Sequence, residues 1–93
     1  MQLPDTLTLA QATATLGRLR AALSAAPAGA SFEVDASTLA ELDTSALAVL
    51  LDAQRLARER NLVMHVIRPP AKLVQLAKLY GVQGLLGLQA SAA

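Results

Sequence analysis

Two hydroxyl residues follow an aspartate where a long apolar segment begins, in the order Asp43-Thr44-Ser45-Ala46-Leu47. Asp, Thr and Ser side chains bind the free backbone amides of a helix's first turn, so this segment predicts the start of a helix. The unpaired amides and the positive end of the helix dipole favour an anion there, including a phosphate on a local hydroxyl. Capping alone is one interpretation, and a surface that a partner binds or a kinase modifies is the other.

The remaining polar residues do not form a recognisable reaction centre. His65 is the sole histidine and stands inside an apolar run, in a chain without cysteine, so we expect a structural role for it. Asp35 and Asp43 could approach one another as a carboxylate pair or cation site, but Asp35 more simply ends a strand by binding loop amides. No Ser-His-Asp set, glycine-rich phosphate loop or metal-ligand spacing is present. The sequence therefore predicts no enzyme activity, no metal, no cofactor and no small-molecule substrate.

Composition and charge further narrow the functional classes to which this protein could belong. The chain has 93 residues, 54% of them hydrophobic, with one Phe, one Tyr and a formal net charge of +1. Clustered cations for phosphates and exposed aromatics for base stacking are both missing, which argues against a nucleic-acid partner. No apolar stretch reaches the roughly 18 residues of a membrane span, and the N-terminus does not resemble a signal peptide. We expect one domain over residues 1–93, located in the cytoplasm.

The pattern of apolar residues predicts alternating strands and helices. Period-two alternation or a continuous β-branched run predicts strands at residues 6–9, 31–35 and 62–67. Helical spacing predicts helices over residues 12–23, 46–60 and 71–80. This order is typical of an α/β fold, in which helices pack against a sheet with substantial parallel pairing.

Several local details follow from the same pattern. Thr13 is the expected N-cap of the first helix. The run from Leu62 to Ile67 is typical of a central strand covered on both faces. We expect Tyr80 on the buried face of the third helix, with its hydroxyl reaching water. Residues 85–88 are expected to form a short strand or turn, and residues 89–93 a frayed tail.

The stretch from Phe32 to Leu51 resembles the STAS domain. It contains Phe-Glu-Val-Asp-Ala-Ser, a short loop, and then Asp-Thr-Ser-Ala-Leu at the start of a helix. The resemblance continues through the strand, the Arg-Pro-Pro turn and the helix ending Leu-Ala-Lys-Leu-Tyr-Gly at Gly81, and that ending is most like MlaB-like members of the family. It implies a STAS-like sandwich of a mixed sheet and about three helices.

The resemblance implies two alternative functions. In MlaB-like proteins a threonine after the aspartate, here Thr44, contacts the ATPase of an ABC transporter that moves phospholipids and maintains outer-membrane lipid asymmetry. Such a subunit is non-catalytic, cytoplasmic and held at the inner membrane by the ATPase and its permease. In anti-sigma factor antagonists a kinase phosphorylates the next hydroxyl, here Ser45. Thr44, the Leu-Ala-Lys-Leu-Tyr ending and the five residues before the first strand, where antagonists usually have an extra strand or hairpin, favour the transporter subunit. On this interpretation Asp43, Thr44, Ser45, Ala46 and Leu47 form the partner-binding site.

Overall fold

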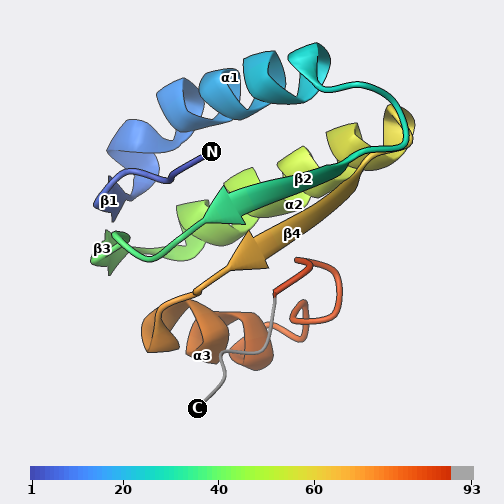
Figure 1. Ribbon diagram of the computed structural model, residues 1–93. Coiled ribbons are helices and arrows are strands. Elements are labelled where there is room, and N and C mark those ends of the chain that lie inside the picture. The colour runs from blue at the N-terminus through green and yellow to red at the C-terminus, as the bar shows by residue number, and fades with distance from the viewer. Residues whose placement is uncertain (89–93) are drawn as a thin grey trace.

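The computed structural model describes residues 1–88 and has three helices and four short strands (Figure 1). Along the chain they are β1 (Thr6–Leu7), α1 (Leu9–Ala25), β2 (Ser31–Asp35), β3 (Glu41–Leu42), α2 (Thr44–Glu59), β4 (Val63–Ile67) and α3 (Ala71–Leu79). The predicted α/β class and its three helices are confirmed. β3 is an addition, since the sequence predicted only a short link there, and the predicted tail at 89–93 lies outside the described residues.

The strands form two small parallel sheets. β2 pairs with β4 over five residues, from Ser31 opposite Val63 to Asp35 opposite Ile67. β1 pairs with β3 in a second, two-residue ladder. Parallel neighbours need a crossover, and a helix provides it in both cases: α1 lies between β1 and β3 in the chain, and α2 lies between β2 and β4.

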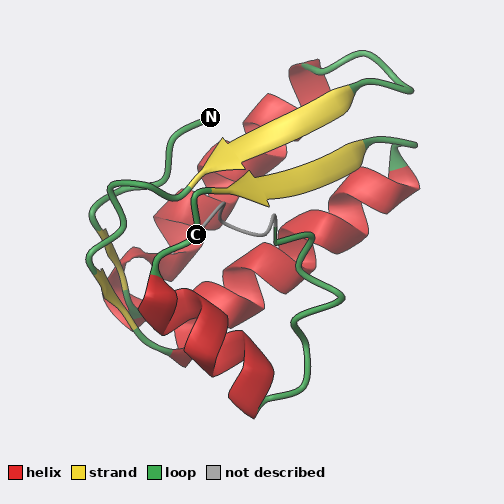
Figure 2. Cartoon of the chain, turned by 60° about the horizontal axis from the view of Figure 1, so that its bottom comes forward, coloured by secondary structure: helices red, strands yellow, loops and turns green. Residues whose placement is uncertain are grey.

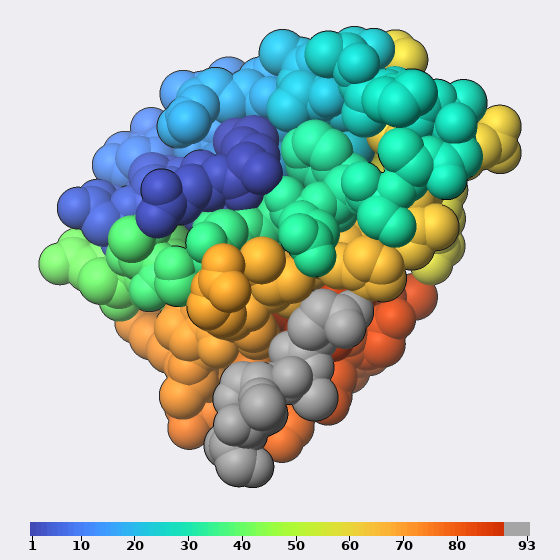
Figure 3. Space-filling view, viewed as in Figure 1, coloured from blue at the N-terminus to red at the C-terminus, as the bar shows by residue number. Residues whose placement is uncertain are grey.

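Both ends of the described chain extend the larger sheet. Leu3 N donates to Asp35 O at 2.9 Å, and Asp35 N donates to Met1 O at 2.7 Å, which places the first residues beside β2 (Figure 3). On the other edge Val66 forms a bridge with Leu88, and Val66 N donates to Gly87 O at 2.9 Å. The expected strand or turn at residues 85–88 is therefore a turn that ends in a bridge to β4.

α2 is the central helix of the molecule. It packs against α1 on one side, against α3 on the other and against β4 (Figure 2). Its inward side chains are fully buried at Ala46, Leu50, Ala53 and Ala57. Small Ala residues on this face allow neighbouring elements to approach closely, and burying the aliphatic side chains supplies the main driving force for folding.

The N-cap of α1 lies five residues earlier in the chain than predicted. Its N-cap is Thr8, not Thr13, and the Gln11 carbonyl oxygen of the side chain accepts from Thr8 N at 3.1 Å and from Thr8 Oγ1 at 2.7 Å. The glutamine follows the cap by three positions, the spacing of a capping box. The prediction of Thr13 was wrong because it followed the apolar stripe that begins at Ala12, whereas the first turn of α1 includes the exposed residue Leu9.

β4 is covered on one face only. Met64 and Val66 are buried, whereas Val63 is 55% exposed and His65 lies on the outer face, opposite Glu33 of β2. The expectation of a strand covered on both sides was wrong, because an apolar run alone does not tell how many faces are packed. Tyr80 is also not in the core. α3 ends at Leu79, the chain turns at Gly81 with φ of 70°, and the Tyr80 side chain is 58% exposed.

Gly87 and Gly17 make a matched pair for testing the C-terminal packing. Gly87 has φ of 66°, and an added Cβ would lie 2.5 Å from Met64 O and would also overlap the Gln54 side-chain amide, which donates to Met64 O and Leu86 O. We expect Gly87→Ala to lower the free energy of unfolding by about 2–4 kcal/mol. Gly17 lies within α1 with open space around it, so Gly17→Ala should raise stability by about 0.5–1 kcal/mol. Urea titration measures both, and equal effects would contradict this packing.

Candidate functional site

Asp43 connects the first turns of two helices. Its Oδ1 accepts from Ser45 N at 2.8 Å, which caps α2, and its Oδ2 accepts from Leu9 N at 3.3 Å, in the first turn of α1. The four N-terminal amides of a helix have no partner within it, so one carboxylate here satisfies amides from both helices. The predicted cap is confirmed, and the side chain additionally fixes α1 against α2.

Electrostatics keep this carboxylate ionised. Hydrogen bonds from the Ser45 amide and hydroxyl and from the Leu9 amide lower the pKa of Asp43, because each of them stabilises the charged form. Asp35 is a separate case. The Arg68 guanidinium lies 2.8 Å from its Oδ2 and Ser37 N donates to its Oδ1, and both hold the Asp35 pKa far below its usual range. Asp35 thus ends its strand by binding a loop amide, as predicted. The two aspartates bind different groups and do not form a carboxylate pair.

Thr44 lies at the edge of an apolar groove between α2 and the end of α3. The groove has a volume of about 320 Å³ and is lined by Thr44, Leu47, Ala48, Leu51, Tyr80 and Val82. We refer to it as the Thr44 groove. Thr44 is exposed, so its hydroxyl is available to a partner, while the aromatic ring of Tyr80 supplies a large apolar contact. Leu79, beside Tyr80 in the chain, is 76% exposed.

Ser45 faces the other side of α2. It lines a second groove of about 370 Å³ between α1 and α2, together with Leu9, Ala12, Thr13, Leu16, Ala48, Val49 and Asp52. Ser45 is half-buried. Successive helix residues are rotated by about 100°, so Thr44 and Ser45 reach different grooves, and Ala48 contributes to both.

The five predicted site residues differ in what a partner could reach. Thr44 and Asp43 are exposed, Ser45 is half-buried, and Leu47 lines the Thr44 groove with little exposure. Ala46 is fully buried and belongs to the core. Tyr80, Val82 and Leu51 complete the groove and were absent from the sequence-based site. No local pattern indicated them, because helical spacing placed Tyr80 on the buried face of the third helix.

Residues 1–88 contain no group of three or more His, Cys, Asp or Glu side chains placed to hold a metal ion. Among the same residues no helix is both long and apolar enough to cross a membrane.

Comparison with known proteins agrees with this architecture. Residues 2–87 match a protein family described as Mlab, STAS domain. The chain belongs to the STAS domain family. This confirms the resemblance seen in the sequence, and the family includes both MlaB and the anti-sigma factor antagonists. STAS domains are generally non-catalytic. No curated protein sequence matches the chain.

The cap of this STAS domain can be tested through stability. Asp43→Ala leaves the amides of Ser45 and Leu9 without their acceptor, and we expect a decrease in Tm of roughly 4–8 °C. Asp43→Asn keeps an acceptor oxygen and should cost less. Circular dichroism at neutral pH measures both, and an unchanged Tm for Asp43→Ala would contradict the role of the cap.

The same variants test the charge of Asp43. Its folded pKa is lowered, so its stabilising effect is complete above the unfolded-state pKa of about 3.9 and is lost as pH falls through the folded-state value. Between neutral pH and this acid range, Asp43→Asn should therefore lose less stability than the parent chain. Parallel curves of stability against pH for Asp43→Asn and for the parent chain would contradict the lowered pKa of Asp43.

Proposed function

We propose that this STAS domain is a non-catalytic, cytoplasmic subunit that binds the ATPase of a phospholipid-transporting ABC transporter, together with its permease. The supporting observation is the exposed Thr44 hydroxyl at the edge of an apolar groove that Tyr80 flanks. Non-catalytic docking fits a surface of aliphatic side chains with few polar groups. On this proposal the protein lies at the inner membrane through its partner and supports lipid asymmetry of the outer membrane.

The groove has the composition of a protein-binding surface. Interface contacts that contribute most are often aromatic side chains at the centre of a desolvated patch, with isolated hydrogen-bonding groups that set the register. Tyr80 is 58% exposed in the free chain and stands beside the apolar Leu51 and Val82. Thr44 offers a donor and an acceptor at the edge of the same groove.

The alternative function, a phosphorylation-switched anti-sigma factor antagonist, would use Ser45. The local geometry favours Thr44 instead. Ser45 is half-buried, and its backbone amide donates to the Asp43 carboxylate at 2.8 Å. A phosphate there would add about −1.5 to −2 charges beside an ionised carboxylate, which is electrostatically unfavourable. Neither obstacle applies to Thr44, because it is exposed and would contact the partner without being phosphorylated.

A charge at position 44 should disrupt docking. Thr44→Glu places a carboxylate where the proposed interface excludes water, and we expect at least a tenfold loss of affinity for the ATPase. Gln75→Glu adds the same charge on an exposed position of α3 outside the groove and is the matched control. Calorimetric titration with the purified ATPase gives both affinities. Normal binding by Thr44→Glu would refute the site, and phosphate transfer to Ser45 by a cognate kinase would support the alternative.

Truncation of the aromatic ring tests the α3 side of the groove. Tyr80→Ala removes an exposed side chain from the proposed contact and should weaken ATPase binding by about 2 kcal/mol, while leaving the Tm nearly unchanged. Val63→Ala shortens an exposed apolar residue on the open sheet face and serves as the control, with no expected effect on binding. A large Tm decrease for Tyr80→Ala would instead assign the ring to the core.

A further inference from the structure

A groove with an arginine on each side separates the C-terminal halves of α1 and α2, at the opposite end of α2 from Thr44. It has a volume of about 300 Å³ and is lined by Arg20, Leu23, Ser24, Leu56 and Arg60. We propose that this arginine groove binds a phosphate-bearing anion, supplied either by the headgroup of an anionic phospholipid or by a free phosphate compound.

Arg20 is held loosely enough to bind a ligand. Its guanidinium lies 3.6 Å from Asp52 Oδ2 and its side chain is 56% exposed. Arg55 makes the shorter contacts with Asp52, at 2.6 and 3.1 Å to Oδ1, and Arg55 is therefore the main partner of that carboxylate. Exposed ion pairs contribute little to stability, so Arg20 loses little when it turns towards an anion.

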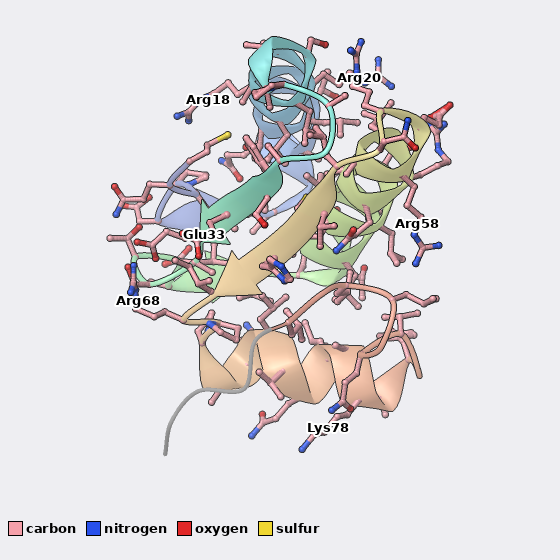
Figure 4. The ribbon with its side chains drawn as sticks, turned by 45° about the vertical axis from the view of Figure 1, so that its right-hand side comes forward. Arg18, Arg20, Glu33, Arg58, Arg68 and Lys78 are labelled. Atoms are coloured by element: carbon pink, nitrogen blue, oxygen red, sulfur yellow. The ribbon has the colours of Figure 1, made fainter. Side chains whose placement is uncertain are left out.

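At the C-terminal end of α2, some arginines form no ion pair within residues 1–88 that would stabilise the fold. Within the described part of the chain, no ion pair joins Arg58 or Arg60 to a carboxylate. Arg20 and Arg58 project from the same side of the molecule, whereas Arg18 points the other way (Figure 4). Arg58 lines a different groove with Leu62 and His65, so Arg20 and Arg60 are the two cations that the arginine groove itself presents.

The side chains of the groove suit a phosphate group. Guanidinium groups bind phosphate oxygens through paired hydrogen bonds, and Arg20 and Arg60 present two of them across one opening. Ser24 adds a hydroxyl donor. Leu23 and Leu56 supply an apolar surface between the arginines, against which the carbon skeleton of a phosphate ester can pack. Because the Thr44 groove uses the first half of α2, an anion here leaves that surface free.

Vesicle binding tests the proposal on the complete chain. Sedimentation is measured with vesicles of phosphatidylcholine alone and of phosphatidylcholine mixed with phosphatidylglycerol, at low and raised salt. The free-anion arm follows the backbone amides of Leu23 and Ser24 by NMR during titration with inorganic pyrophosphate. The test variant is the double substitution Arg20→Gln and Arg60→Gln. The control is Arg18→Gln with Lys78→Gln, which removes the same charge elsewhere on the surface.

We expect salt-sensitive binding of the parent chain, weakened roughly 30-fold by the test pair and much less by the control pair. Binding to the phosphatidylglycerol vesicles without a pyrophosphate effect supports a lipid headgroup. Amide shifts with pyrophosphate, without vesicle binding, support a free phosphate compound. The proposal is overturned if neither probe binds, or if the control pair weakens binding as much as the test pair. Unchanged circular dichroism of both variants shows that folding is not the cause.

Discussion

The candidate site depends on one carboxylate that binds two helix N-termini. Asp43 accepts hydrogen bonds from the first turns of α1 and α2, so it fixes where α2 begins and how α1 lies beside it. Because α2 begins at Thr44, the 100° rotation between successive helix residues directs Thr44 towards α3 and Ser45 towards α1. The buried face of α2, which includes Ala46, Leu50, Ala53 and Ala57, fixes this rotation, and the Asp43 cap holds the first turn in place.

The central helix carries different chemistry along its length. Its first half is buried on the core side and lines two mainly apolar grooves on the other, with Ala48 shared between them. Its second half carries Asp52, Arg55 and Glu59, linked through exposed ion pairs, as well as Arg58, and Arg60 is its C-cap. The first half suits contact with a protein and the second suits contact with an anion. The sheet supports both halves from one side, since β2 and β4 bury only the face that points to the helices.

Local patterns predicted the elements well, and long-range packing accounts for the differences. Helical spacing and β-branched runs located all three helices and both main strands, and Asp43 was identified as the cap because its chemistry is local. Tyr80 was misplaced because helical spacing continues the buried stripe of α3, whereas the helix ends one residue earlier and the chain reverses at Gly81. The Thr44 groove joins residues from α2 with Tyr80 and Val82, more than 25 positions away, a contact that periodicity does not encode. The sequence indicated Thr44 as a site residue, but it did not indicate that Tyr80 forms the other side of the groove.

Photo-crosslinking from position 80 in the native cells tests the central claim most directly, because it reports the partner and the contact surface together. A photoreactive phenylalanine analogue replaces Tyr80 in one chain and Val63, on the open sheet face, in a second. The account predicts a crosslink from position 80 to an ABC-transporter ATPase and none from position 63. A crosslink from position 80 to a serine kinase or an anti-sigma factor, or equal capture of the ATPase from both positions, would contradict it.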